Sequence, residues 1–210
     1  MTIAHLANLK FIYEARPGAQ KLLHKLCVSL LRYCDFIRLD KLFYEAGIHC
    51  QKENDLGLAS VFLNRYLDIN EIIDDPDNNN IPEDDEFRIT DIPSPYDVNM
   101  PMKNFISEAE KEKIKDWLLQ VNMNHKVDTS LPVRSCEKCG TKIYDASVCC
   151  FKCKSQSEVC ILTGLPVNSN NGRKCKSCGK WGLKDFWSIY LNNFANCPWC
   201  NNPANWIKWS

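Results

Sequence analysis

The sequence has no long hydrophobic run and no net formal charge. Its apolar runs are much shorter than the roughly 20 residues that a helix needs to cross a bilayer. In the first thirteen residues, His5 and Lys10 interrupt the hydrophobic character of the sequence. We therefore expect neither a transmembrane helix nor a secretory signal peptide. The zero net charge hides an asymmetry, because ten Lys and Arg residues oppose four Asp and Glu residues from Ser135 onward.

Histidine is scarce, and none lies in the cysteine-rich part of the chain. The four histidines are His5, His24, His49 and His125, which all precede Cys136. The sequence also lacks a Walker loop, an H-E-x-x-H motif and a Ser-His-Asp set. Because the cysteine-rich part offers no histidine as a general base, we predict no catalytic residue on this chain.

Two stretches lack the pattern of a packed element. Residues 74–86 (DDPDNNNIPEDDE) contain seven acidic residues, three asparagines and two prolines. Such a segment cannot bury enough apolar surface to offset its ordering entropy, so we expect a flexible acidic loop. Residues 91–105 contain three prolines, which disfavour helix in the preceding residues. This segment is expected to run extended along a neighbouring surface.

The first seventy residues have the apolar spacing of amphipathic helices. Apolar positions recur at intervals of three and four, the period of one helix face. The pattern covers residues 19–34, 39–53 and 55–73. Small residues at Ala46, Gly47 and Ala59 would allow paired helices to approach closely. This periodicity fits a stack of helical hairpins and an ordinary helical bundle equally well.

One further helix has a clear start. Ser107 followed by Glu110 fits the capping box, in which two side chains satisfy the first free backbone N–H groups. The apolar stripe that follows is Ile114, Trp117, Leu118 and Val121. The helix should end before Asn124, and Leu131-Pro132 marks a boundary with the cysteine-rich part.

Cysteine is abundant, with thirteen residues in the chain. In a chain without an export signal, this abundance favours metal binding over disulfides. We interpret Cys27, Cys34 and Cys50, which lie in helical segments, as buried apolar side chains. The other ten cysteines all follow residue 135.

Eight of these ten form four C-x-x-C pairs. The pairs are Cys136 and Cys139, Cys150 and Cys153, Cys175 and Cys178, and Cys197 and Cys200. Two intervening residues allow both sulfurs of a pair to face one tetrahedral ion. The sequence therefore predicts two structural zinc ions. Each closed set of four thiolates leaves no open position for substrate. With both ions bound, the net charge of residues 135–210 falls from +6 to about +2, because each zinc with four thiolates carries −2.

The spacing of the pairs indicates how they combine. Ten residues separate the first two pairs and eighteen the last two, whereas twenty-one separate Cys153 from Cys175. We therefore expect sequential pairing rather than the interleaved ligands of a cross-braced RING. Cys149 competes with Cys150 as a ligand, and Cys160 is left over as a packed side chain.

Basic and aromatic residues around the last two C-x-x-C pairs suggest an alternative function, nucleic-acid binding. Two zinc ribbons could bind nucleic acid through lysines and tryptophans, with charge contacts that weaken steeply with salt. The residues are Lys174, Lys176, Lys180, Lys184, Trp181 and Trp199. Once the thiolate charges are counted the basic signal is weak, so we expect no nucleic-acid partner.

The stretch VCILTGLPV, residues 159–167, resembles the opening loop of U-box domains. A later helix with Trp187, followed by CPWC, resembles the second half of a U-box or RING. This resemblance implies a groove for a ubiquitin-conjugating enzyme or ubiquitin. Its contact residues would be Ile161, Leu162, Trp187 and Pro198. U-boxes normally lack metal, so the two predicted zinc sites depart from that pattern and put in doubt a ligase surface like that of a metal-free U-box.

The upstream segments resemble the C-terminal part of the intraflagellar transport protein 172 family. The similar segments are VSLLRYCDFIRLDKLFYEAGIHC, FLNRYLDINEIID, TDIPSPYDVNMP and SEAEKEKIKDWLLQVNM. The resemblance covers essentially the whole chain. It implies a mainly α fold of TPR-like helical hairpins over residues 1–130, followed by a small α+β U-box or RING-like zinc module over residues 131–210.

The same resemblance implies a function. The chain would be a scaffold fragment of a complex B subunit that supports cilium assembly and signalling, with other intraflagellar transport subunits as partners. Its location would be the cilium or flagellum, at base, axoneme and tip, and the cytoplasm. The terminal module would bind ubiquitin or a conjugating enzyme. The enzyme alternative is a ubiquitin ligase of the RING or U-box type that forms no covalent intermediate on this chain.

Overall fold

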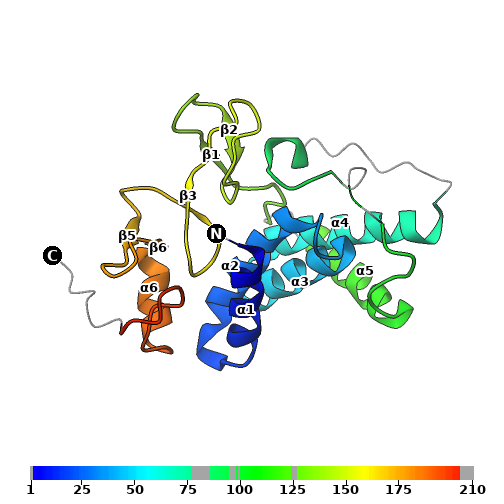
Figure 1. Ribbon diagram of the computed structural model, residues 1–210. Helices are drawn as coiled ribbons and strands as arrows, with labels where there is room; N and C mark the ends of the chain where they lie inside the picture. The colour runs from blue at the N-terminus through cyan, green and yellow to red at the C-terminus, as the bar shows by residue number, and fades with distance from the viewer. Residues whose placement is uncertain (1, 77–85, 95–97, 99, 124–126, 204–210) are drawn as a thin grey trace. The chain divides into compact units, whose positions relative to one another are not determined.

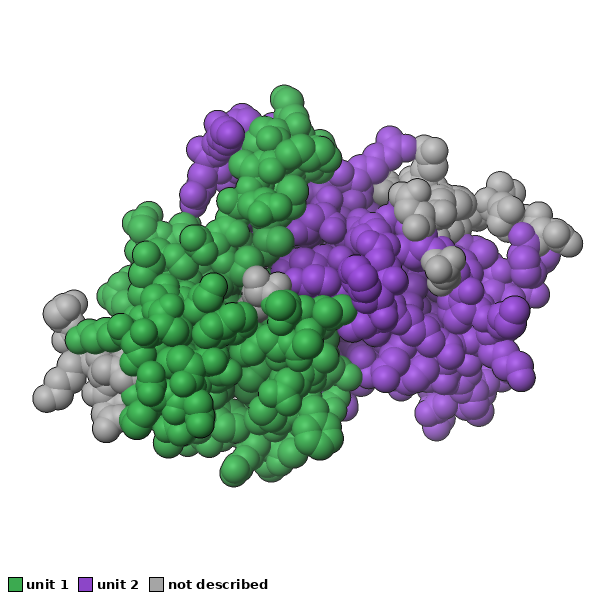
Figure 2. Space-filling view, in the orientation of Figure 1, with its two compact units in different colours: residues 1–30, 146–210 green, residues 31–145 purple. Residues whose placement is uncertain are grey.

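The fold is known from a computed structural model (Figure 1). It describes residues 2–76, 86–94, 98, 100–123 and 127–203. The expected acidic loop, residues 74–86, falls mostly outside these ranges. Two compact units are present, one made of residues 1–30 with 146–210 and the other of residues 31–145 (Figure 2). The division into domains at residue 130 remains a prediction.

The unit of residues 31–145 is built mainly of helices. Its α-helices are α3 (Leu39–Lys52), α4 (Leu56–Asp74) and α5 (Glu108–Asn122), and its 3-10 turns are η2 (Leu31–Tyr33) and η3 (Phe87–Ile89). The capping box is confirmed: Ser107 Oγ accepts a hydrogen bond from the Glu110 N–H, and the Ser107 N–H donates to the Glu110 carboxylate at 3.2 Å. These helices agree with the apolar periodicity.

Helices α3 and α4 pack closely at small residues, as predicted. Ala46 and Ala59 are fully buried. A Cβ atom placed on Gly47 would lie 2.5 Å from Cγ of Leu63, closer than van der Waals contact. The absence of a side chain at Gly47 therefore sets how closely the two helices approach.

Replacing Gly47 by Ala should destabilise this unit, although Ala is the better helix former. Helix propensity favours Ala by about 1 kcal/mol, but overpacking costs about 1–3 kcal/mol, and Leu63 has little room to move. We expect a net loss of about 1 kcal/mol in urea unfolding. The control is Gly47→Ala with Leu63→Ala, where the two changes should show a favourable coupling. A gain in stability from Gly47→Ala alone would contradict this packing.

Aromatic side chains fill the core of residues 31–145. The ring of Phe43 lies edge to face against Phe62, with centroids 6.2 Å apart, and against Phe87, at 5.7 Å. The ring of Phe105 lies 5.7 Å from that of Tyr44. Phe105 ends the proline-containing segment, and the described residues of that segment are not helical. The described residues therefore agree with the expected absence of helix, and Phe105 packs on Tyr44 of α3.

The unit of residues 1–30 and 146–210 combines three α-helices and a 3-10 turn with small strands. It contains α1 (Ile3–Glu14), η1 (Pro17–Ala19), α2 (Gln20–Leu30), β3 (Glu158–Val159), β4 (Pro166–Val167), β5 (Gly172–Lys174), β6 (Trp181–Leu183) and α6 (Lys184–Leu191). Strand β3 pairs with β4, and β5 with β6, both antiparallel. In residues 31–145, β1 (Val133–Ser135) pairs in the same way with β2 (Lys142–Tyr144).

Trp187 on α6 forms the centre of the small core next to β5 and β6. It has no exposed surface, and a Cβ atom on Gly182 would lie 2.7 Å from Cε2 of its indole. Its ring contacts Tyr190 edge to face, with centroids 5.9 Å apart. Gly182 thus lets strand β6 lie directly against the indole. In the described part of the chain, no helix has the length and apolar character needed to cross a membrane.

Candidate metal centres and the adjoining loop

The four C-x-x-C pairs share one backbone turn. In each, the carbonyl of the first cysteine accepts a hydrogen bond of 2.8–2.9 Å from the N–H of the residue after the second. The donors are Gly140, Lys154, Gly179 and Asn201, and all four have positive φ between 55° and 70°. Glycine and asparagine adopt this left-handed conformation readily. The turn aims both sulfurs of a pair to one side.

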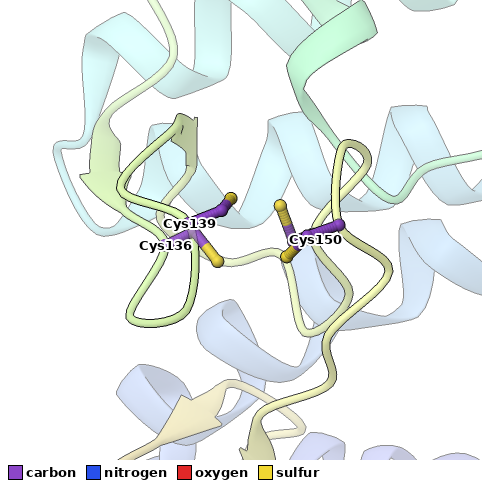
Figure 3. Close-up of side chains that lie close together, drawn as sticks. Cys136, Cys139 and Cys150 are labelled. Atoms are coloured by element: carbon purple, nitrogen blue, oxygen red, sulfur yellow. The ribbon is translucent and has the colours of Figure 1, made fainter.

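The first group of sulfurs belongs to Cys136, Cys139, Cys150 and Cys153. These four atoms all lie within 4.8 Å of one another, and Figure 3 shows the side chains of Cys136, Cys139 and Cys150 pointing toward a common point. Cys149 is not in this group, and its Sγ lies 3.9 Å from the carbonyl oxygen of Cys150. The geometry therefore favours Cys150 over its neighbour.

The second group consists of Cys175, Cys178, Cys197 and Cys200, whose sulfurs also lie within 4.8 Å of one another. The Sγ atoms of Cys175 and Cys200 are 3.8 Å apart. Zinc–sulfur bonds of about 2.3 Å in a tetrahedron place neighbouring sulfurs about 3.8 Å apart. The described residues thus offer two sets of four thiols that could each hold a metal ion, and the spacing in the second set fits zinc.

Protonation affects the second group unevenly. Burial raises the pKa of the Cys197 thiol, whereas a hydrogen bond from the Asn202 backbone lowers the pKa of Cys200. Because the thiolate is the ligand form, metal binding must displace the proton of Cys197. Metal affinity at this group should therefore increase with pH.

Residues 160–164 form a fifth turn of the same kind. The N–H of Gly164 donates to the carbonyl of Cys160 at 2.8 Å, and Gly164 has a φ of +76°. Thr163 stands where the other turns have their second cysteine. Cys160 is fully buried, and its Sγ accepts a hydrogen bond of 3.3 Å from the Leu183 N–H. This turn is held by hydrogen bonds. The likeness of its sequence C-x-x-T-G to the C-x-x-C-G of residues 136–140 and 175–179 is the signal that could have revealed it.

The predicted partner-contact residues differ in their exposure. Ile161 is 1% exposed, while Leu162 and Trp187 are fully buried. Pro198 is half-buried. The contact role of all four residues stays a prediction.

Two side chains of α1 contact the backbone of this loop, and sequence reasoning did not find them. The hydroxyl of Tyr13 donates to the Leu162 carbonyl at 3.1 Å. Nε2 of His5 lies 2.8 Å from the Ile161 carbonyl and donates to it. Burial lowers the pKa of His5, which favours the neutral ring in this contact. The backbone of the loop is therefore bound by an element from the other end of the chain.

The lysines of the nucleic-acid alternative lie over tryptophan rings. Nζ of Lys174 is 4.7 Å from the centroid of Trp181, and Nζ of Lys180 is 5.1 Å from that of Trp199. These residues line a groove of about 240 Å³ that also contains Glu158. The cationic groups are engaged with the rings, and an acidic side chain adjoins them. This arrangement does not favour phosphate binding.

Comparison with known proteins adds the missing context. No family model matches the chain. Intraflagellar transport protein 172 of Chlamydomonas reinhardtii is 32% identical over 179 residues, which is 81% of this chain and 10% of that protein. The human homologue is 31% identical over 210 residues, and that of Danio rerio is 33% identical over 209 residues. Each of these matches covers 99% of the chain and 12% of the relative.

The chain belongs to the intraflagellar transport protein 172 family. This agrees with the family resemblance of its helical segments. The chain spans about a tenth of the length of these relatives. The family likeness extends through both compact units, because two of the matches cover nearly the whole chain.

Proposed function

We propose that this chain is a scaffold segment of an intraflagellar transport subunit, with other transport subunits as its partners. Relatives named intraflagellar transport protein 172, or intraflagellar transport protein osm-1 in Caenorhabditis elegans, indicate a location in the cilium or flagellum. Helices α3 and α4 form a close helical hairpin at Gly47, which supports a TPR-like arrangement. In complex B, this arrangement would offer helical surfaces to neighbouring subunits.

The cysteine-rich part holds two zinc ions in this proposal. Four thiols form each set, and thiolates are ligands that zinc accepts in a closed tetrahedral site. Bound zinc supplies the folding energy of a small module, typically about 10–16 kcal/mol in apparent terms. The ligands would be the eight cysteines of the two groups described above. With no open position, the zinc would be structural.

The module would also bind ubiquitin or a ubiquitin-conjugating enzyme. One observation carries this part of the proposal: the turn of residues 160–164, which has Thr163 in place of a second cysteine, lies against β6, with the Ile161 N–H donating to the Trp181 carbonyl at 2.9 Å. Beside it lies the four-thiol group that contains Cys175. A loop held by hydrogen bonds next to a metal-held loop supports the likeness to a U-box or RING. Ile161, Leu162, Trp187 and Pro198 remain the proposed contacts.

Titration of the isotopically labelled, zinc-loaded chain tests this proposal by NMR. One purified ubiquitin-conjugating enzyme is added first, and ubiquitin alone is added to a separate sample. We expect shifts in the backbone amides on either side of Pro198, and a weaker response in Pro198→Ala. Pro203→Ala is the matched control, because Pro203 is an exposed proline outside the proposed contacts. Absence of shifts with both proteins, in this chain and in a variant that lacks the His5 and Tyr13 contacts to the loop, would contradict the ubiquitin-related role and leave a zinc-held assembly segment.

The same samples separate a binding module from a ligase. A ligase would accelerate discharge of ubiquitin from the loaded conjugating enzyme. In that case the chain orients the loaded enzyme, because no nucleophile is proposed at the contact residues. A discharge rate equal to that in buffer, with both zinc sites filled, would exclude the ligase alternative.

A further inference from the structure

Helix α1 binds the backbone of the loop of residues 160–164 through two side-chain donors. The Tyr13 hydroxyl and the His5 ring donate to the consecutive carbonyls of Leu162 and Ile161, at 3.1 and 2.8 Å. Tyr13 has no exposed surface, and its hydrogen bond is buried. His5 is also packed edge to face on the ring of Trp199, with centroids 4.9 Å apart. Residues separated by about 150 positions thus make a specific polar contact.

The loop is also packed tightly against both N-terminal helices. A Cβ atom on Gly164 would lie 2.8 Å from Cβ of Ser29 on α2 and 3.4 Å from Cδ1 of Leu6 on α1. Leu6 and Ser29 are fully buried. The loop therefore has no free face toward these helices, and its apolar side chains are covered. Because Ile161 and Leu162 are almost fully buried, a protein that bound both side chains would have to displace an element packed on this loop, and α1 is one of these elements.

The segment between the helices reaches the end of α6 as well. The ring of Tyr13 lies 5.9 Å from that of Phe194, and the guanidinium of Arg16 lies 5.8 Å from the same ring. Nδ2 of Asn193 donates to the carbonyl of Gly18 at 3.2 Å. The contact is therefore continuous from the loop of residues 160–164 to the residues that follow α6.

The geometry points to α1 as an internal ligand that occupies the partner-binding face of the module. This inference rests on the proposed ubiquitin-related role of the loop. The partner is a ubiquitin-conjugating enzyme, which competes with α1 for Ile161 and Leu162. The chain as described is the closed form, and only the fraction with α1 displaced binds the partner through the loop. The measured dissociation constant is then the intrinsic one divided by that fraction.

Weakening the two polar contacts tests this competition in the full zinc-loaded chain. The double variant His5→Leu with Tyr13→Phe removes both donors while nearly preserving side-chain volume. Loss of one hydrogen bond typically changes an equilibrium by about threefold to tenfold. We expect the double variant to bind a conjugating enzyme roughly ten to a hundred times more tightly than the unaltered chain. Phe11→Ala is the matched control, because Phe11 lies on the same helix and is 73% exposed; its affinity should be unchanged.

Hydrogen exchange of residues 3–14 provides the second measurement. Binding of a partner ordinarily slows exchange, but release of α1 should speed exchange in this helix when the enzyme is added. A further variant, Leu6→Asp, places a charge beside Gly164 and opens the contact if the double variant stays closed. Zinc content of two ions per chain shows that the module remains folded in each variant.

The outcomes separate the inference from the proposed function. Tighter binding by the open variants, with faster exchange in α1 on binding, is the expected result. Equal binding by all variants, with α1 exchange unchanged by the enzyme, would overturn the inference and leave the ubiquitin-related role intact. No binding by any variant, although α1 exchanges faster in the open variants, would overturn the ubiquitin-related role and the inference with it.

Discussion

Chelating the bound zinc is expected to unfold the segment from β5 to the last described turn, residues 172–203. The strands there are three residues long and α6 has eight residues, so the segment has little apolar surface of its own to bury. Structural zinc typically contributes about 10–16 kcal/mol in apparent binding energy, far more than such a core supplies. Helices α3 to α5 should keep their far-ultraviolet circular dichroism, because none of the eight thiols lies on these helices. The near-ultraviolet signal of buried Trp187 should disappear.

Single cysteine changes identify the ligands of the first site. Cys150→Ser should reduce the zinc content from two ions to one in native mass spectrometry. Cys149→Ser, at the neighbouring position, should retain both ions, because its sulfur is not in the group of four. The reverse result would transfer the ligand role to Cys149. A wild-type chain that carries no zinc after expression in zinc-supplemented medium would contradict both metal sites.

Replacing Trp187 by Ala should cost about 3–5 kcal/mol of unfolding free energy, the usual range for a large buried aromatic side chain. The indole has no exposed surface and lies against the backbone of Gly182 and the ring of Tyr190. Its removal leaves a cavity that the short strand β6 cannot fill. Urea unfolding of the zinc-loaded chain, followed by circular dichroism, measures this loss.

Trp199 provides the matched control for that measurement. It is the same residue type but is 38% exposed, and it lines a groove rather than the core. Trp199→Ala should therefore cost much less than Trp187→Ala. Equal losses would mean that Trp187 does not anchor the small core.

Local sequence patterns predicted the features that depend on neighbouring residues. The capping box at Ser107 and Glu110, the close approach at Gly47, and the helices α3 and α4 all follow from side chains within one or two helical turns. The two sulfur groups follow from the spacing of the C-x-x-C pairs, because two intervening residues allow only a narrow range of turns. These patterns need no knowledge of the rest of the chain.

Contacts between distant residues were not predictable in the same way. The hydrogen bonds from His5 and Tyr13 to the loop carbonyls join residues about 150 positions apart, and no local pattern marks their ends. The contact role of Ile161 and Leu162 rests on the resemblance of residues 159–167 to the opening loop of U-box domains. That resemblance carries no information about contacts between this loop and helix α1. The prolines and acidic residues before residue 105 predicted the absence of helix, but not that Phe105 would pack on Tyr44.

One compact unit combines residues 1–30 with residues 146–210, so its folding is delayed during synthesis. Helices α1 and α2 are synthesised before residues 146–210 of the same unit, and the 115 residues from Leu31 to Asp145 lie between the two parts. At about 5–20 residues per second, the surfaces of Leu6 and Tyr13 that contact residues after 146 stay uncovered for roughly 6–23 seconds. A stop codon that removes residues after 146 leaves these faces uncovered for the lifetime of the product. Chaperones and proteases that recognise exposed apolar helices would then recognise the truncated product.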